Sequence, residues 1–268
     1  MFFGKGQTSL PLQIADSLYS INNYSKAAVW YEFILYENTN KSSNELAITG
    51  KLNCLKAQGL YMEATEFIVR SNNISVSAEF KQQMGYQEML NNYLAGNFSE
   101  AINLSANYLE TNDKEIKVMS YLVVILSLNE LNKWKEADSV LQKLLKQFPT
   151  NDSCLSKIYT QIPHFKSESK AKLLSTLFPG VGQMYADKFW QGMANSLLQV
   201  GFLGFSIATF QKEYYYSAVL VGLNNFFSFR KGDKIRTHKL IEQYNRKKSI
   251  AFNQTNKLIL IKYIKGIL

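Results

Sequence analysis

The sequence is poor in the side chains that carry most enzyme and metal chemistry. Its 268 residues include two histidines and two cysteines. His164 and His238 have no cysteine or paired carboxylate at a useful spacing, and Cys54 and Cys154 lie a hundred residues apart. We therefore expect no catalytic residue, no metal site and no cofactor, and we interpret the two cysteines as unpaired small hydrophobic residues.

Proline is also scarce, with four in the chain, and the alternating apolar pattern of strands is rare. Hydrophobic residues make up 46% and aromatic residues 13% of the chain, which supplies a packed core and argues against disorder. Leu and Lys, which are both good helix formers, are the two most frequent residues, and this composition favours helices. The sequence predicts an all-α fold with room for one large domain or two modest ones.

One pattern, Asn or Gly-x-aromatic-x-x-Ala, recurs four times in the first 150 residues. It stands at Asn22–Ala27, Gly59–Ala64, Gly96–Ala101 and Asn132–Ala137. The alanines follow one another at spacings of 37, 37 and 36 residues. Each copy predicts a helix, a tight turn and a second helix. The Asn or Gly supplies the left-handed backbone of the turn, the aromatic ring wedges between the helices, and the alanine is small because the paired helix crosses there.

These segments resemble tetratricopeptide repeats over about residues 8–150. Ala15, Leu18, Tyr31, Leu128, Leu141, Leu144 and Pro149 also match the family pattern. The third unit departs from it at Met89, Asn92 and Ser105, and the period exceeds the 34 residues usual in the family. The extra residues are expected in longer connections such as Thr39–Asn44 and Ser71–Ser77. The resemblance implies a helical solenoid of about four units.

In the register of that family, the first helices of successive units build a concave binding face. The residues expected to form this partner-binding groove are Asn53, Lys56, Tyr86, Leu90, Tyr93, Leu122 and Leu126. A groove of Tyr and Leu suits an apolar peptide or a packed helix from a protein partner. The alternative is that these residues meet the chain's own following segment.

The composition becomes apolar after a linker at residues 151–170. Phe189–Phe210 has 22 residues without a charge, and after Gln211–Glu213 the segment Tyr214–Phe229 has 16. Because a membrane-spanning helix needs about 20 residues, residues 171–230 predict a two-helix transmembrane hairpin. The small residues Gly201, Gly204, Ala208, Ser217, Ala218 and Gly222 are expected to let the two helices pack closely. A soluble hairpin buried under the solenoid is the alternative.

A specific motif opens this region, with the residues Pro179, Gly180, Gly182, Gln183 and Tyr185, followed by Trp190 and Gly192. Pro179 breaks the preceding helix and the glycines permit a sharp bend. Gln183 is expected to satisfy the backbone groups that the bend frees, and Tyr185 and Trp190 suit the lipid headgroup level. No strand precedes the motif and no third glycine or P-loop lysine follows it, which argues against nucleotide binding.

This region resembles short two-span domains of bacterial membrane proteins that open with P-G-x-G-Q-x-Y. The whole order of repeats, hairpin and basic tail resembles uncharacterised envelope proteins of Bacteroidetes-type bacteria. The resemblance implies an export signal, repeats outside the inner membrane and a hairpin anchor, and it implies no activity. Met1–Gln7 looks like the end of a signal sequence, but an ordinary terminus is equally compatible with it.

The tail, residues 231–268, begins in the most basic part of the chain. Residues 230–248 hold eight Lys or Arg against Asp233 and Glu242, a net charge of +6. Beside a hydrophobic span, such a cluster is typical of a membrane flank. Nucleic acid is the alternative partner, and it is disfavoured because phosphate binding normally needs a basic face on a folded reader. The final segment is expected to lie on a membrane, pair with a partner or pack on the chain's own core.

An even number of spans puts the repeats and the tail on one side of the membrane. The positive-inside rule favours the cytoplasm for that side. The signal-like start and the family resemblance favour the periplasm, which we adopt as the prediction for a bacterial inner-membrane protein. We expect a membrane-tethered scaffold that binds another envelope protein or peptide, in protein insertion, secretion or envelope assembly. The alternative is a soluble repeat protein whose basic tail binds nucleic acid or an anionic membrane surface.

Overall fold

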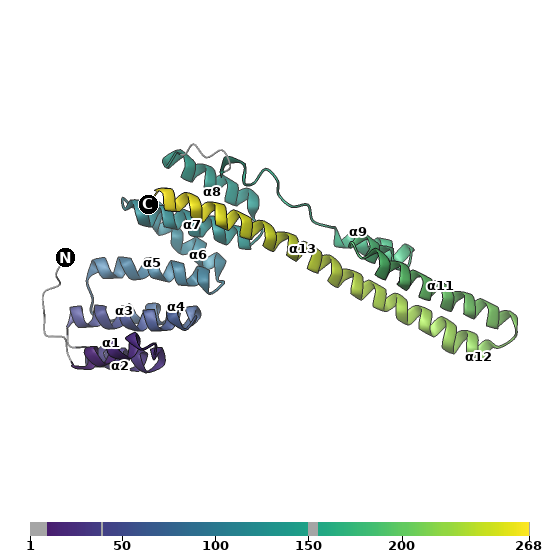
Figure 1. Cartoon of the computed structure of the whole chain (residues 1–268), viewed down its shortest axis with the longest axis horizontal. Helices are drawn as coiled ribbons and strands as arrows, with labels where there is room; N and C mark the ends of the chain where they lie inside the picture. The colour runs from purple at the N-terminus through teal and green to yellow at the C-terminus, as the bar shows by residue number, and fades with distance from the viewer. Residues whose placement is uncertain (1–9, 39, 150–154, 268) are drawn as a thin grey trace. The chain divides into compact units, whose positions relative to one another are not determined.

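The computed structural model describes residues 10–38, 40–149 and 155–267, and every regular element in these ranges is helical (Figure 1). The chain forms two compact units. The first contains the described residues up to Thr160 together with 257–267, and the second runs from Gln161 to Asn256. Cys154 and the signal-like Met1–Gln7 lie outside the described residues.

The first unit is an array of four helical hairpins. The hairpins are α1 and α2 (Leu10–Ser20, Tyr24–Glu37), α3 and α4 (Lys41–Ala57, Tyr61–Ser71), α5 and α6 (Ala78–Leu94, Phe98–Ser105), and α7 and α8 (Lys114–Glu130, Trp134–Gln147), with a 3-10 turn η1 at Ala106–Tyr108. Each helix packs against the next along the chain, so the hairpins stack into a repeat array. The prediction of an all-α helical repeat is confirmed at this level.

The turns within the hairpins have the predicted geometry. The first residue of each copy of the pattern has a positive φ: Asn22 at 60°, Gly59 at 74°, Gly96 at 86° and Asn132 at 58°. In the first copy, the amide of Asn23 donates to the carbonyl of Leu18 at 2.9 Å, a bond that closes a helix C-terminus in a left-handed turn. The aromatic residue is the first residue of the second helix in all four hairpins, and the four alanines are completely buried.

Of the two longer connections expected between hairpins, Ser71–Ser77 agrees with the structure, because α4 ends at Ser71 and Ser77 is the N-cap of α5. The expected loop Thr39–Asn44 is wrong, since α3 already begins at Lys41. Asn40 is the N-cap residue of α3, and its side-chain Oδ1 accepts a hydrogen bond from the backbone amide of Ser43 at 2.8 Å. Ser77 and Asp113 cap α5 and α7 in the same way. A capping side chain satisfies an otherwise unpaired amide and fixes where a helix begins.

Part of the segment that follows the repeats is packed into the first unit. A short 3-10 turn, η2 (Leu155–Lys157), leads to Tyr159, and both Leu155 and Tyr159 are buried in the first unit. The hydroxyl of Tyr159 donates to Oδ1 of Asn129 at 2.8 Å. Burial raises the pKa of Tyr159 well above its usual range. Residues 155–160 of the expected linker therefore belong to the repeat unit.

The second unit consists of α9 (Glu168–Leu177), α10 (Val181–Tyr185), α11 (Phe189–Gln211), α12 (Tyr215–Ser217), a π-helix η3 (Ala218–Leu223) and the first part of α13 (Asn224–Ile267). The turn of the repeats is used twice more here. Asp187 (φ 62°) and Glu213 (φ 66°) each stand two residues before an aromatic residue that opens a helix. Gly192 and Ala218 take the position of the repeat alanine, and both are buried. The hairpin thus follows the same local rule as the repeats.

Candidate functional site

The Pro179–Gly180 bend is held by a buried carboxylate from α13. Asp233 is 2% exposed, and its Oδ2 accepts a hydrogen bond from the backbone amide of Gly180 at 3.0 Å. Its Oδ1 accepts a hydrogen bond from Nε2 of Gln183 at 2.7 Å. Charge-assisted bonds of this kind are among the stronger hydrogen bonds in proteins. The bend is therefore tied to a helix that follows it by about fifty residues.

The glycines of the motif are required by space as well as by backbone angle. Gly180 has a φ of 76°, and a Cβ there would lie 2.0 Å from the carbonyl oxygen of Gly192. A Cβ at Gly182 would lie 2.0 Å from Oγ of Ser175. A Cβ at Gly192 would lie 2.4 Å from the carbonyl oxygen of Gly180. Backbone therefore approaches backbone where α10 and α11 meet, and no larger residue fits without movement.

The expected role of Gln183 is wrong in one respect. The amide freed by the bend, that of Gly180, is satisfied by Asp233, while Gln183 orients the carboxylate. In the sequence, Asp233 is one of two acidic residues in a basic segment. That pattern alone does not predict that its carboxylate holds the bend at Gly180. The signal in the sequence is a single aspartate next to Gly232, with Lys and Arg residues on both sides of it.

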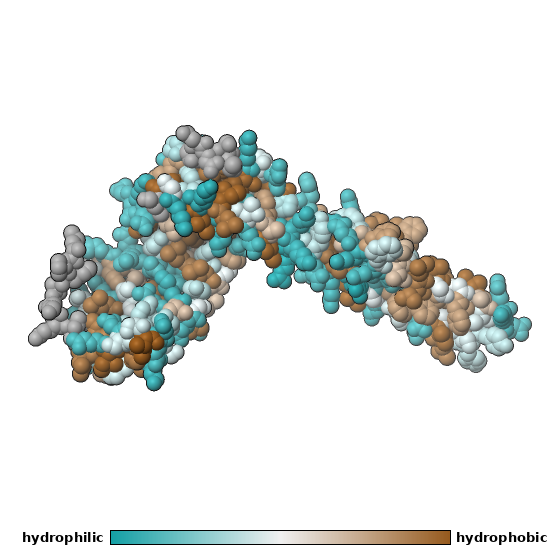
Figure 2. All heavy atoms as spheres, viewed as in Figure 1, coloured by the Kyte–Doolittle hydropathy of each residue, from teal (hydrophilic) through white to brown (hydrophobic). Residues whose placement is uncertain are grey.

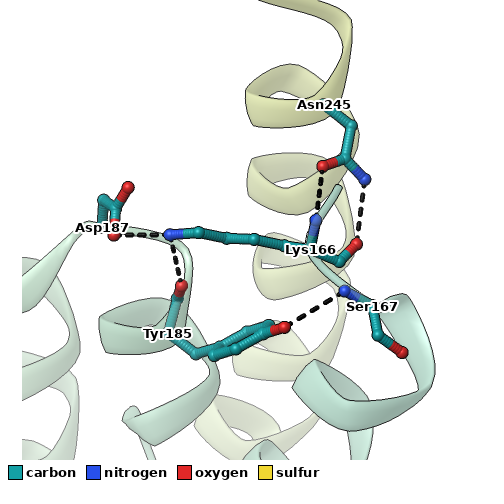
Figure 3. Close-up of polar contacts among 5 residues, drawn as sticks. All are labelled: Lys166, Ser167, Tyr185, Asp187 and Asn245. Atoms are coloured by element: carbon teal, nitrogen blue, oxygen red, sulfur yellow. Dashed lines mark hydrogen bonds and ion pairs between the residues drawn. The ribbon is translucent and has the colours of Figure 1, made fainter. Parts of the chain in front are cut away.

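Tyr185 is part of a polar cluster rather than a free headgroup anchor (Figure 3). Its hydroxyl accepts a hydrogen bond from the amide of Ser167 at 3.1 Å, and its carbonyl accepts one from Nζ of Lys166 at 2.8 Å. The backbone of Lys166 pairs twice with the side chain of Asn245 on α13. Lys166 also forms an ion pair with Asp187. Five residues from four segments are joined, which fixes the start of α9 against α10 and α13.

Within the described residues, α11 is the one helix that is long and apolar enough to cross a membrane. Core helices of soluble proteins meet the same criterion, but they are mostly buried, whereas 11% of the most apolar window of α11 is buried. Large exposed apolar residues of α11, of η3 and of the start of α13 include Leu197, Val200, Ile207, Phe210, Val219, Leu220 and Phe227. Figure 2 shows apolar residues gathered along this hairpin. So much exposed apolar surface is typical of an interaction site or a membrane contact.

The contact between the two hairpin helices differs from the predicted one. Gly201 and Gly204 have open space where a Cβ would stand, so they do not bring the helices together. Ser206 makes the contact instead, donating to the carbonyl of Ala218 at 3.1 Å and lying against Gly222. Ala218 and Gly222 were predicted correctly. Deeper in the hairpin, the rings of Phe202 and Phe229 stack at 5.3 Å.

The polar residues of the hairpin bond mostly within their own helix. Nε2 of Gln199, a fully buried residue, donates to Oδ1 of Asn195 at 3.2 Å. Nδ2 of Asn225 donates to the carbonyl of Val221 at 2.6 Å. Gln191 is different, because it accepts a hydrogen bond from the guanidinium of Arg236 on α13 at 3.1 Å. Hydrogen bonds across the hairpin are therefore made by Gln191 with Arg236 and by Ser206 with Ala218.

Aromatic residues stand at both ends of the hairpin. Trp190 is the second residue of α11 and is 74% exposed, while Tyr214 and Tyr216 follow the turn at its far end and are also exposed. About 20 residues separate Trp190 from Phe210, and a helical rise of about 1.5 Å per residue makes this roughly 30 Å, the thickness of a bilayer's hydrocarbon core. Aromatic residues at the two membrane interfaces are the usual pattern of a spanning segment.

The residues expected to form the partner-binding groove on the repeats divide into two groups. Leu122 and Leu126 are buried inside the first unit, and Tyr86, Leu90 and Tyr93 are half-buried around Met89 and Val123. Burial raises the pKa of Tyr86 to about 12. Asn53 and Lys56 are partly exposed. The ammonium of Lys56 donates to Oε1 of Gln87 at 3.0 Å, and burial lowers its pKa.

The C-terminal end of α13 packs on the repeat unit and reaches this face. The ammonium of Lys257 lies 5.7 Å from the ring centre of Tyr93. The hydroxyl of Tyr263 donates to the carbonyl of Phe148 at 2.6 Å, and Leu260 and Ile264 are buried. The C-terminal end of α13 therefore contacts Tyr93 of the expected groove, whereas the Lys56 side chain of that groove bonds to Gln87.

The described residues contain no group of three or more His, Cys, Asp or Glu side chains placed to hold a metal ion. The described thiol, that of Cys54, is buried and free, and burial raises its pKa to about 11. A thiol held neutral in this way is a poor nucleophile.

The repeat array, with its four identical turns, defines the first unit as a helical-repeat domain. Comparison with known proteins agrees. A TPR repeat-containing protein of Methanocaldococcus jannaschii is 24% identical to this chain over 195 residues, which cover 66% of this chain and 32% of that protein. This chain thus spans about a third of the length of that relative. No family model matches the sequence, and no solved structure matches it.

Proposed function

We propose that this protein is a membrane-anchored interaction scaffold, in which the α11–α13 hairpin sits in the lipid bilayer and the helical repeats bind another protein. The observation that carries the anchor is the exposed apolar surface of α11, of whose most apolar window 11% is buried. Exposing an apolar surface to water costs a free energy of about 25 cal/mol for each Å², and contact with lipid removes that cost. The repeat array and its distant tetratricopeptide-type relative support the interaction role.

The second helix of the hairpin is shorter in apolar length, and the position of the C-terminus supports two crossings. A single crossing would put the repeats and the C-terminal end on opposite sides of the membrane. Tyr263 and Phe148 are hydrogen-bonded within the first unit, so both belong to one side. The sixteen uncharged residues from Tyr214 to Phe229 are followed by Arg230, whose long side chain reaches the carbonyl of Thr176. Basic side chains near helix ends extend toward the interface in this way.

The surface that we propose for a protein partner lies on the first two repeats, because the C-terminal end of α13 meets the face of the later ones. Asn53 and Lys56 remain partly exposed on α3. A second exposed surface is an apolar stripe with helical spacing on α2, formed by Val29, Phe33 and Tyr36, and Lys51 of α3 lines the groove beside it. A peptide or amphipathic helix is the kind of partner that such a surface accepts.

We further propose that the protein resides in a bacterial inner membrane, with the repeats on the periplasmic side, and acts in envelope assembly, secretion or protein insertion. The support for this location is the resemblance of the P-G-x-G-Q-x-Y region to bacterial two-span domains. The basic cluster of residues 230–248 favours the cytoplasmic side instead. Protease added outside spheroplasts distinguishes the two, since it cuts periplasmic repeats and spares cytoplasmic ones.

Extraction of isolated membranes tests the anchor. We expect the full chain to stay in the membrane pellet in high salt and in alkaline carbonate, and to be released by detergent. Release by salt alone would instead indicate a peripheral electrostatic binder, such as the nucleic-acid or surface-binding alternative. Photo-crosslinking from position 33 in mild detergent then tests the partner surface, with Glu66, exposed on α4, as the matched control position.

A further inference from the structure

A cleft of about 920 Å³ opens on the hairpin, between α11 and α13, entirely within the second unit. Its walls are polar at one end, with Gln191, Arg236 and Lys239, and apolar at the other, with Leu198 and Phe229. The size falls in the range of ordinary ligand sites. An occupant of this cleft therefore has a polar head and an apolar body.

The cleft carries net positive charge. Arg236 and Lys239 are both exposed, and their three-residue spacing puts them on one face of α13. Asp233 also lines the cleft, but both of its oxygens are engaged by Gly180 and Gln183. The carboxylate is thus compensated within the protein, while the two cations face the open space. A planar guanidinium with a neighbouring ammonium is the usual recognition set for phosphate.

Asn195 also lines the cleft, and its Nδ2 atom, which has almost no accessible surface, has no hydrogen-bond partner among the described residues. A rotation of this side chain would turn the unpaired donor toward an oxygen of an occupant of the cleft and satisfy it. Asn195 lies about one turn of α11 beyond Gln191, between the cationic end and Leu198. The oxygen of a glycerol ester lies at the corresponding place between a phosphate and an acyl chain.

The level of the cleft agrees with this assignment. Gln191 accepts a hydrogen bond from Arg236 and directly follows Trp190, which we place at the headgroup level. The apolar wall at Leu198 and Phe229 continues toward the lipid-facing part of the hairpin. We propose that this cleft binds one anionic phospholipid, with its phosphate at Arg236 and Lys239 and an acyl chain along Leu198 and Phe229. The proposal rests on the proposed membrane anchor.

Native mass spectrometry of the full chain in detergent tests the site, with phosphatidylglycerol, phosphatidylcholine or inorganic phosphate added separately. The wild-type chain is expected to retain one phosphatidylglycerol at concentrations at which phosphatidylcholine is not retained. The double variant Arg236→Gln/Lys239→Gln is expected to lose at least about tenfold in that affinity, because each charged hydrogen bond contributes at least that factor. The matched control Arg246→Gln/Lys247→Gln removes the same charge from exposed positions of α13 outside the cleft, and it is expected to bind as the wild type does.

Three results would overturn the proposal. Equal retention of the two lipids would mean that the cleft does not recognise a negative headgroup. Equal losses in both double variants would mean general attraction to a basic tail. Competition by millimolar inorganic phosphate would mean a site for the free anion. Failure of the anchor is distinguishable, because it appears as release from membranes without detergent, whereas failure of the lipid site leaves the chain in the membrane.

Discussion

The carboxylate of Asp233 accepts a hydrogen bond from the backbone amide of Gly180, so the centre of the basic segment holds the bend that precedes the hairpin. In Asp233→Ala, the backbone amide of Gly180 and the side-chain amide of Gln183 lose their buried acceptor. Each unsatisfied donor costs about 1–3 kcal/mol. We expect hydrogen exchange of peptides covering residues 178–185 to become faster. Lys231→Ala, at an exposed position of the same helix, is the control. Unchanged exchange in Asp233→Ala would show that the bend does not depend on this residue.

The second prediction concerns two glycines of α11 that look alike in the sequence. In Gly192→Ala the new methyl group meets the carbonyl of Gly180, and we expect a loss of about 1–3 kcal/mol from overpacking. In Gly201→Ala the methyl group meets nothing within 4 Å, and we expect a gain of about 0.5–1 kcal/mol from helix propensity. Helicity followed through an SDS titration in mixed micelles measures both. Equal effects would contradict the packing described for α10 and α11.

The third prediction compares two leucines of α13. Leu260 is fully buried in the repeat unit and Leu258 is 72% exposed. Leu260→Ala is expected to destabilise the repeats by about 2–5 kcal/mol, and Leu258→Ala by less than about 0.5 kcal/mol. Chemical denaturation of full chains in which Trp30 and Trp190 are replaced by Phe, followed by the fluorescence of Trp134, distinguishes them. If both variants unfold like the wild type, the C-terminal end does not pack on the repeats, and the argument for two membrane crossings loses that support.

Glu88 supplies a prediction of pH dependence. Burial, and then the carboxylate of Glu100, raise the pKa of Glu88 above 4.5 in the folded state. A raised carboxyl pKa means that the folded state binds the proton more readily than the unfolded state does. The ionised carboxylate therefore lowers the free energy of unfolding at neutral pH. This destabilisation disappears as the pH falls below the folded-state pKa. We expect Glu88→Gln to raise Tm at pH 7 and to have little effect once the pH is below about 4, where Glu88 is protonated in both states.

Glu66→Gln, at an exposed position of α4, is the matched control and is expected to leave Tm nearly unchanged at both values. A Tm increase of Glu88→Gln that persists unchanged at low pH would show that its origin is not the charge.

Local features of this fold were predictable from the sequence because their causes are local. Asn22 and Gly59 end helices since few other residues adopt a positive φ, and the alanine five residues later must be small for the crossing. The same rule would have placed the hairpin turns at Asp187 and Glu213, which carry the pattern with an acid in the first position.

Contacts between distant residues were not predictable, because a single sequence does not record its pairings. Asp233 and Gly180 are separated by 53 residues, and Lys257 and Tyr93 by more than 160. Composition likewise could not decide which small residues of α11 face η3. Gly201 and Ser206 are both small, but the rotation of the helix puts Ser206 alone against Ala218.

Membrane anchoring of the repeats requires that lipid surrounds the hairpin. Spin labels at Val200 and Leu220, both exposed, report this directly in chains reconstituted into vesicles, with a label at Tyr36 on the repeats as the aqueous control. Cys154 is replaced by Ser in all three chains, and Cys54 is buried with a raised thiol pKa, so it labels slowly. We expect oxygen, which concentrates in hydrocarbon, to relax the two hairpin labels, and a water-soluble nickel chelate to relax the label on the repeats. Nickel access to Val200 and Leu220 equal to that at Tyr36 would contradict the account.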